Sequence, residues 1–320
     1  MAELTDSDIS GVLQRAVKLS EQQLKLMREL AEEIFGQDTK IIIGVNGSVA
    51  RRETTSGSDV DLFFLGLGES ELDSLQSQQD IYRARLRDAG IKMPANGGVF
   101  DEPLRADELC ETIGGDNDTN TFITRRMLFL LEGEWIYNQT AFEKLRSDLI
   151  CRYVTEDLAD EKIALFLLND IIRYWRTICV DFEHKIQDVS KPRAIRNIKL
   201  RFSRMLLYFA GVAAVSKTIG MSGVEKRAKL NALFSMPALA RIQDVFEDKA
   251  APLTVLYAEF LASIDDPDIR QVLERSGVEG IDTREYEALV AKARDFKDEL
   301  LTILLKDLKT SHEVVRALLL

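Results

Sequence analysis

The sequence contains little cysteine and little proline. Its 320 residues include three Cys and six Pro. The cysteines, Cys110, Cys151 and Cys179, are odd in number and far apart, which argues against a disulfide framework and against a zinc site of the usual ligand spacing. We therefore expect the protein to work in a reducing compartment, and the cytoplasm is the simplest assignment.

Long hydrophobic runs are also missing. No apolar stretch approaches the roughly 20 residues that a membrane-spanning helix needs. The first residues, Met-Ala-Glu-Leu-Thr-Asp, do not place a basic region before an apolar one, so we expect no secretory signal. Together these absences predict a protein that does not act in the membrane.

The charge is distributed unevenly. The chain has a formal net charge of −11 at pH 7, but the segment from Lys185 to Lys229 holds eleven Lys or Arg and only two acids. An acidic remainder of this size disfavours a surface that wraps DNA broadly. The local basic segment suits one polyphosphate or a short stretch of RNA.

The most informative stretch is Gly47–Leu62, which has an apolar run on each side. We predict a strand, a Gly-Ser turn and a second strand, in which Asp59 and Asp61 share one face because side chains alternate along a strand. Two adjacent carboxylates repel each other, and a divalent cation such as Mg²⁺ or Mn²⁺ compensates for this. Gly47 and Ser48 are the candidate phosphate contacts. The simpler alternatives are two solvated acids and an ordinary turn with a helix cap.

This stretch resembles a known family signature. Gly47-Ser48, Arg51, Glu53 and Ser58-Asp59-Val60-Asp61-Leu62 are similar to the signature of the DNA polymerase β-like nucleotidyltransferase superfamily. The nearest form is Gly-Ser-x-Ala-Arg-Gly-Glu…Ser-Asp-x-Asp-Leu, typical of small bacterial nucleotidyltransferases and of uridylyltransferases that modify nitrogen-signalling proteins. The chain departs from this form at Arg52, where the pattern usually has Gly.

The resemblance implies a nucleoside triphosphate as substrate, a cation held by Asp59 and Asp61, and a third carboxylate that helps to activate the attacking hydroxyl. Asp101 is our candidate for that carboxylate, as a further metal ligand and catalytic residue, because Val99-Phe100 reads as a strand before it. The alternative is that Asp101 caps a helix. Asp116 and Asp118, in a glycine-rich loop, are weaker candidates.

Four further residues are candidates for nucleotide binding. The resemblance adds Arg51 and Ser58 from the motif itself, although Arg51 and Glu53 could instead support the motif loop or form a surface ion pair. Arg196 and Lys199 lie on the basic side of a helix that begins at Pro192. They could reach the triphosphate, or that helix face could simply be solvated.

Hydrophobic periodicity and turn residues predict an α/β (α+β) domain with a small mixed sheet over 1–140 and an all-α helical domain over 141–320. The resemblance implies that the first of these is the nucleotidyltransferase domain. The predicted elements are helix 5–35, strand 40–45, strand 59–65, helix 69–89, and helices 105–113, 119–132, 139–151, 157–187, 192–218 and 283–309.

We therefore predict an Mg²⁺-dependent nucleotidyltransferase that moves a nucleoside monophosphate to a hydroxyl of a protein, a tRNA or a small molecule and releases pyrophosphate. Two alternatives remain open. One is a catalytically silent nucleotide-binding regulatory protein. The other is a partner-binding nucleotidyltransferase of the toxin–antitoxin type, which we rank third because the helical half contains no Arg-x-x-x-x-His motif.

Overall fold

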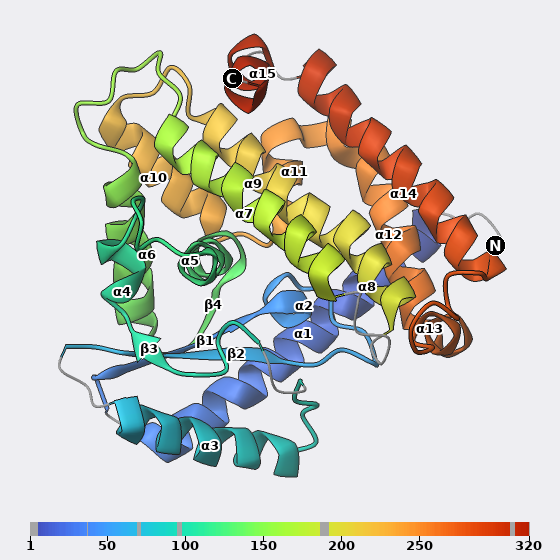
Figure 1. Cartoon of the computed structure of the whole chain (residues 1–320), viewed down its shortest axis with the longest axis horizontal. Helices are drawn as coiled ribbons and strands as arrows, with labels where there is room; N and C mark the ends of the chain where they lie inside the picture. The colour runs from blue at the N-terminus through green and yellow to red at the C-terminus, as the bar shows by residue number, and fades with distance from the viewer. Residues whose placement is uncertain are drawn as a thin grey trace. The chain divides into compact units, whose positions relative to one another are not determined.

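The computed structural model describes residues 6–36, 38–68, 72–94, 98–185, 192–307 and 311–319. It is mostly helical and contains one four-stranded sheet (Figure 1). By internal contacts the chain forms two compact units. The sheet unit comprises Ala16–Ala159 and Met221–Pro237, and the helical unit comprises Met1–Arg15, Asp160–Gly220 and Ala238–Leu320.

The sheet unit contains all four strands. Its elements in chain order are most of α1 (Asp6–Phe35), β1 (Ile41–Asn46), α2 (Gly47–Ala50), β2 (Asp61–Gly66), α3 (Leu72–Asp88), β3 (Leu104–Arg105), α4 (Glu108–Glu111), α5 (Asn120–Glu132), β4 (Glu134–Tyr137), α6 (Gln139–Tyr153) and α10 (Gly223–Phe234). The strand order is β3-β2-β1-β4; β1 is antiparallel to β2 and β4, and β3 is parallel to β2. The predicted small mixed sheet is confirmed.

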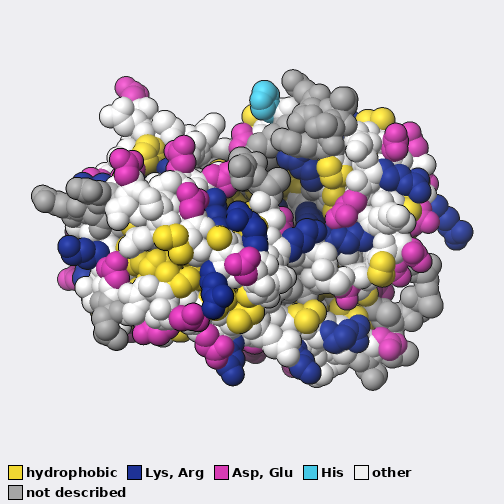
Figure 2. All heavy atoms as spheres, turned by 90° about the horizontal axis from the view of Figure 1, so that it is seen from below, with side chains coloured by type: hydrophobic (Ala, Val, Ile, Leu, Met, Phe, Trp, Pro, Cys, Tyr) yellow, Lys and Arg dark blue, Asp and Glu magenta, His cyan; other side chains and the backbone are white. Residues whose placement is uncertain are grey.

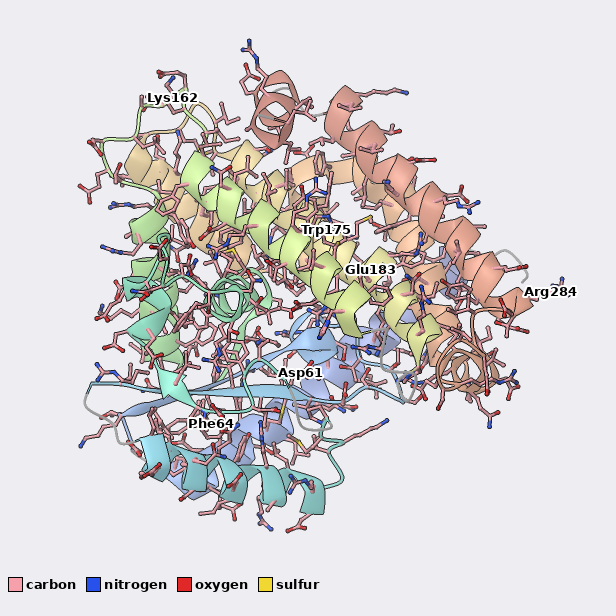
Figure 3. All side chains as sticks on the ribbon, viewed as in Figure 1. Asp61, Phe64, Lys162, Trp175, Glu183 and Arg284 are labelled. Atoms are coloured by element: carbon pink, nitrogen blue, oxygen red, sulfur yellow. The ribbon has the colours of Figure 1, made fainter. Side chains whose placement is uncertain are left out.

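One face of the sheet packs against α1 and α3. Leu62 and Phe64 of β2 point to this face and join a core that includes Met27 and Tyr82. Figure 3 shows Phe64 on the side of β2 that faces α3. The Tyr82 hydroxyl donates to the Met27 carbonyl at 2.6 Å, which ties the two helices together beneath the strands.

The opposite face packs against α5 and α6 through aromatic rings. The Phe63 ring lies 5.9 Å from Phe129 and 6.3 Å from Phe142, centroid to centroid. Gly44 of β1 leaves room for this ring, because a Cβ at Gly44 would stand 2.1 Å from Phe63 Cζ. Because side chains alternate, Asp61 lies on this aromatic face, two residues before Phe63.

The helical unit is built from α7 (Leu165–Lys185), α8 (Arg193–Lys199), α9 (Met205–Lys217), α11 (Ala238–Phe246), α12 (Ala251–Asp265), α13 (Pro267–Leu273), α14 (Arg284–Thr302) and α15 (Ser311–Leu319). A π-helical turn over Leu200–Arg204 joins α8 to α9, so the predicted helix 192–218 forms with a wide turn inside it. The Phe202 ring of that turn stacks on Phe260 at 4.5 Å, centroid to centroid. Trp175, labelled in Figure 3, stacks on Tyr208 at 5.2 Å and joins α7 to α9.

Several elements differ from the sequence-based expectations: the predicted helix 157–187 begins only at Leu165, and of the predicted helix 105–113 only Glu108–Glu111 is helical. Val99 and Phe100 lie in a turn rather than a strand, and the third strand is the short Leu104–Arg105. Strand β4 falls in a region that we expected to be helical throughout. The ends of the predicted helices at 5, 69–71, 186–187 and 308–309 lie outside the described residues.

The contacts also place 141–159 with the sheet, whereas the sequence placed the division at 140. Phe142 of α6 explains this, because its ring packs on Phe129 and Phe63 in the aromatic core. Helix α10 packs against α5 and α6 as well, although it lies more than 60 residues farther along the chain.

On the face that Figure 2 shows, acidic and basic side chains lie beside one another. No helix among the described residues is long and apolar enough to cross a membrane.

Candidate functional site

The candidate site lies where β1 ends and β2 begins. These strands pair antiparallel, with Asn46 directly opposite Asp61 and Gly44 opposite Phe63. Directly paired residues point to the same face of a sheet, with Cβ atoms about 4.5–5.5 Å apart. Asn46 and Asp61 are therefore neighbours at the edge of the aromatic face, and Figure 3 shows Asp61 beside α2.

Gly47 has a conformation and a position that exclude a side chain. Its φ of +77° is the left-handed region that glycine enters without a steric penalty. A Cβ at Gly47 would stand 2.6 Å from Asp61 Oδ2. The Asp61 carboxylate therefore lies against the backbone of the turn, where only glycine fits.

Asn46 is a buried polar residue that the sequence analysis missed. It is 3% exposed, and within the described part of the chain neither its Oδ1 nor its Nδ2 has a hydrogen-bond partner. It stands at the N-cap position of α2, yet its side chain makes no capping bond. The signal in the sequence was a polar residue closing an otherwise apolar strand, Ile-Ile-Ile-Gly-Val-Asn.

Asp59 precedes Asp61 across a buried Val60. Val60 is 1% exposed and belongs to the core on the α1–α3 face, and its N–H donates to the Lys92 carbonyl at 3.0 Å. Asp59 and Asp61 are both half-buried. The chain therefore anchors Val60 in the core while the acids on either side of it remain partly accessible.

Arg51 forms a buried ion-pair network. Its Nε donates to Glu53 Oε2 at 2.8 Å, and its Nη1 donates to Glu132 Oε2 at the end of α5. Arg51, Glu53 and Glu132 are 7%, 4% and 6% exposed. Of the three roles considered for Arg51, these contacts match support of the motif loop, because the buried guanidinium is engaged with two carboxylates.

Arg52 occupies the position where the resembled pattern has glycine, and its backbone explains that preference. Its φ is +61°, a conformation that costs free energy for a residue with a Cβ. The side chain donates to Glu21 Oε1 at 2.6 Å and to Glu134 Oε2 at 3.0 Å. The turn thus forms with arginine in place of glycine, and two ion pairs hold it.

The polar residues between α2 and β2 stabilise the connection itself. The Ser58 hydroxyl accepts from the Thr55 N–H at 3.0 Å, and the Ser58 N–H donates to the Thr55 carbonyl. Thr54 exchanges hydrogen bonds with the buried Ser20 of α1. Ser48 is half-buried, and its carbonyl accepts from Glu53 N–H at 2.8 Å. In these contacts Ser58 shapes the loop that leads to Asp59.

Asp101 lies in a turn and faces α3. Its Oδ2 accepts from the Gly98 N–H at 2.8 Å, its Oδ1 is 3.7 Å from Arg83 Nη2, and its carbonyl accepts from Gln79 at 3.2 Å. Gln79 and Arg83 belong to α3, which covers the face opposite Asp61. The neighbouring Phe100 points the other way and lies 5.0 Å from Phe63, centroid to centroid.

The structure therefore does not bring Asp101 together with Asp59 and Asp61 into one cluster. Among the described residues, no three Asp, Glu, His or Cys side chains lie close enough together to hold a metal ion. Asp118 is also engaged elsewhere, because it forms a fully buried pair with Arg126 at 2.9 Å.

The donors present nevertheless fit a divalent cation. Mg²⁺ is usually held by one or two protein carboxylates, with water and substrate phosphates completing its shell. Asp59 and Asp61 supply such carboxylates, and the unpaired amide of Asn46 adds a polar group on the Asp61 side. A hard cation with oxygen ligands suits this donor set.

Arg196 and Lys199 lie on α8 of the helical unit. Both are half-buried, and the residue before each of them, Ile195 and Ile198, is buried in the core of that unit. The predicted split of this helix into apolar and basic sides is thus present. Contact of either residue with a nucleotide stays a prediction.

No protein-family model matches the chain, and a search of curated proteins finds no significant match. The nucleotidyltransferase resemblance therefore rests on the residues of the motif alone.

Proposed function

We propose that the protein binds a nucleoside triphosphate with Mg²⁺ or Mn²⁺ at the β1–β2 turn and transfers the nucleoside monophosphate to an acceptor hydroxyl. The observation that carries this proposal is the position of the Asp61 carboxylate against the Gly47 backbone, opposite Asn46. Asp59 and Asp61 would hold the cation, and the backbone of Gly47 and Ser48 would contact the phosphates, because glycine at position 47 adds no side chain of its own. Such a reaction draws on the triphosphate pool of the cytoplasm.

The chemistry is a displacement at phosphorus. The acceptor oxygen bonds to the α-phosphorus, the bond from that phosphorus to the bridging oxygen breaks, and pyrophosphate leaves with the electron pair. A bound divalent cation neutralises charge on the transferring and leaving groups. The hydroxyl proton needs a base, and the residue nominated for that role, Asp101, pairs with Arg83 and must leave it in order to act.

The test is transfer of label from each nucleoside triphosphate, with Mg²⁺, to any species in a lysate. Asp59→Ala combined with Asp61→Ala removes both carboxylates, so we expect label transfer to stop while circular dichroism shows an intact fold. Asp107→Ala is the matched control, since it removes an acid of the same unit that pairs with Arg105. Transfer that survives the double change would contradict the assignment.

One observation favours a second candidate, a nucleotide-binding regulatory protein without catalysis. Asp101 is turned toward Arg83 and the Gly98 N–H, which leaves the cation pair without a third carboxylate. This candidate predicts saturable binding of Mg²⁺–ATP and no product after long incubation. Arg83→Ala removes the ion pair of Asp101 and leaves its hydrogen bond from Gly98 N–H, so product that appears or increases in this variant supports the enzyme.

The chemical nature of the labelled acceptor distinguishes the remaining candidate functions. A labelled protein, a labelled tRNA and a labelled small molecule are distinguished by protease, ribonuclease and filtration. Reproducible co-purification of one protein partner, with no labelled product, would instead support the toxin–antitoxin type of function.

A further inference from the structure

Asn46 combines burial with an unused hydrogen-bonding capacity. Its side-chain oxygen and nitrogen are both buried, and within the described ranges neither has a partner. Folded proteins pair nearly all of their buried polar groups, because a buried group that has left water without a new partner is costly. An amide of this kind at the end of a core strand therefore points to a ligand.

The register shows where the amide is directed. Asn46 pairs directly with Asp61, so its side chain projects from the same face as that carboxylate. The Asp61 carboxylate lies 2.6 Å from the Cβ position of the adjacent Gly47. The side chains of Asn46 and Asp61 and the backbone of Gly47 are therefore neighbours. Asn46 Nδ2 nevertheless does not donate to Asp61.

We propose that Asn46 is a ligand of the divalent cation and provides its amide oxygen Oδ1 beside the carboxylate of Asp61. This inference rests on the proposed function and adds a ligand to the same site. An amide carbonyl is a neutral, hard oxygen donor of the kind that Mg²⁺ and Mn²⁺ accept. Asn46 thus takes the place that a third carboxylate was expected to fill, while Asp101 stays with Arg83.

A neutral third ligand changes the electrostatics of the site. Asp59 and Asp61 bring two negative charges, and a third carboxylate would add further repulsion whenever the cation is absent. With asparagine the cation-free site repels itself less, but the cation is held less tightly, because affinity rises with the charge of the ligands. The expected behaviour is cation binding that tightens strongly when a nucleotide brings its own phosphate charge.

The experiment is a titration of the full chain with Mn²⁺, followed by the electron paramagnetic resonance signal of free Mn²⁺, with and without ATP. Asn46→Leu keeps the volume of the side chain and removes both polar atoms. We expect it to weaken Mn²⁺ binding at least about tenfold, since even changes beyond the direct ligands weaken metal sites by that amount. In EDTA its melting temperature should equal or exceed that of the wild type, because an unpaired buried amide has been removed.

Asn46→Asp provides the opposite test. It adds a charged oxygen ligand at the same place, so Mn²⁺ should bind more tightly than in the wild type, while the melting temperature in EDTA should fall. Asn231→Leu is the matched control, because Asn231 lies on α10 and already donates to the Arg227 carbonyl at 3.1 Å. Its Mn²⁺ affinity should equal that of the wild type.

The outcomes separate this inference from the proposed function. If Asp61→Ala abolishes Mn²⁺ binding but Asn46→Leu binds as the wild type does, the inference is wrong and the proposed function stands. If the wild type binds no Mn²⁺ even with ATP, the proposed function fails. If Asn46→Leu does not fold, Asn46→Asp decides: unchanged Mn²⁺ affinity with weakened Mg²⁺–ATP binding would show that Asn46 donates to phosphate and would overturn the inference.

Discussion

The two halves of the β1–β2 connection use their polar residues differently. In the half that contains Arg51, Glu53, Thr54 and Ser58, the described contacts pair these residues with other groups of the protein. At the strand ends, Asn46 is buried without a partner and Gly47 is bare backbone against the Asp61 carboxylate. The residues of this connection therefore have two roles: some stabilise the loop, and others form the candidate site. The position of a residue within the motif does not predict which of the two roles it has.

The largest expected effect is on the half that stabilises the loop. Arg51→Met removes the cation between two buried carboxylates and should lower the free energy of unfolding by about 3–5 kcal/mol. Chemical denaturation measures the change. The Mn²⁺ affinity of the folded variant should stay within about threefold of the wild-type affinity. A tenfold change in affinity would correspond to about 1.4 kcal/mol of binding free energy.

Two further variants sharpen that result. Arg105→Ala breaks a pair on the surface with Asp107 and should change stability little, because water already screens such pairs. Arg51→Met combined with Glu53→Gln and Glu132→Gln should recover much of the loss, because it removes the uncompensated charges. If Arg51→Met lost Mg²⁺–ATP affinity without losing stability, Arg51 would be a residue of the binding site and not a support of the loop.

The next effect concerns the site half. Gly47→Ala places a methyl group against Asp61 Oδ2 and forces alanine to φ +77°. We expect Mn²⁺ affinity to fall at least about tenfold, as at other disturbed metal sites, together with a stability loss of about 1–2 kcal/mol from the left-handed backbone.

Gly90→Ala is the matched control for Gly47→Ala. Gly90 has φ +81° and nothing within 4 Å of its Cβ position, so it carries the backbone penalty without the contact. Its stability should fall by a similar amount while Mn²⁺ binding is unaffected. Equal Mn²⁺ affinities in Gly47→Ala and Gly90→Ala would show that Gly47 is not part of the cation site.

The smallest expected effect is on stability and concerns Arg52, which lies in the turn between the two halves of the connection. Arg52→Ala loses the ion pairs with Glu21 and Glu134 and keeps the strained φ of +61°, whereas Arg52→Gly loses the pairs and relieves the strain. Arg52→Gly should therefore be more stable than Arg52→Ala by about 0.5–1 kcal/mol, part of the cost of a left-handed non-glycine residue. The difference in thermal unfolding measures it, and Arg52→Ala being the more stable variant would contradict a strained turn.

Local sequence predicted much of the sheet unit. The apolar runs on either side of the Gly-Ser turn located β1 and β2 within two residues, and helical periodicity located α1 and α5. It missed β4, whose four residues directly follow a buried helix and are too few to show a period of two. It also assigned a strand to Val99-Phe100, where the chain turns instead so that Phe100 packs on Phe63.

The sequence by itself determined the strand–Gly-Ser–strand pattern, and with it the placement of Asp61 at a strand end beside a glycine turn. Only the tertiary structure decided which polar residues are already used. Glu132 reaches Arg51 from a helix 81 residues away, Arg83 holds Asp101 on the other face of the sheet, and Asn46 is left without a partner opposite Asp61. The physical reason is that the partners of a buried charged or polar group are side chains that folding brings next to it from distant parts of the chain. Local patterns of residues do not carry that information.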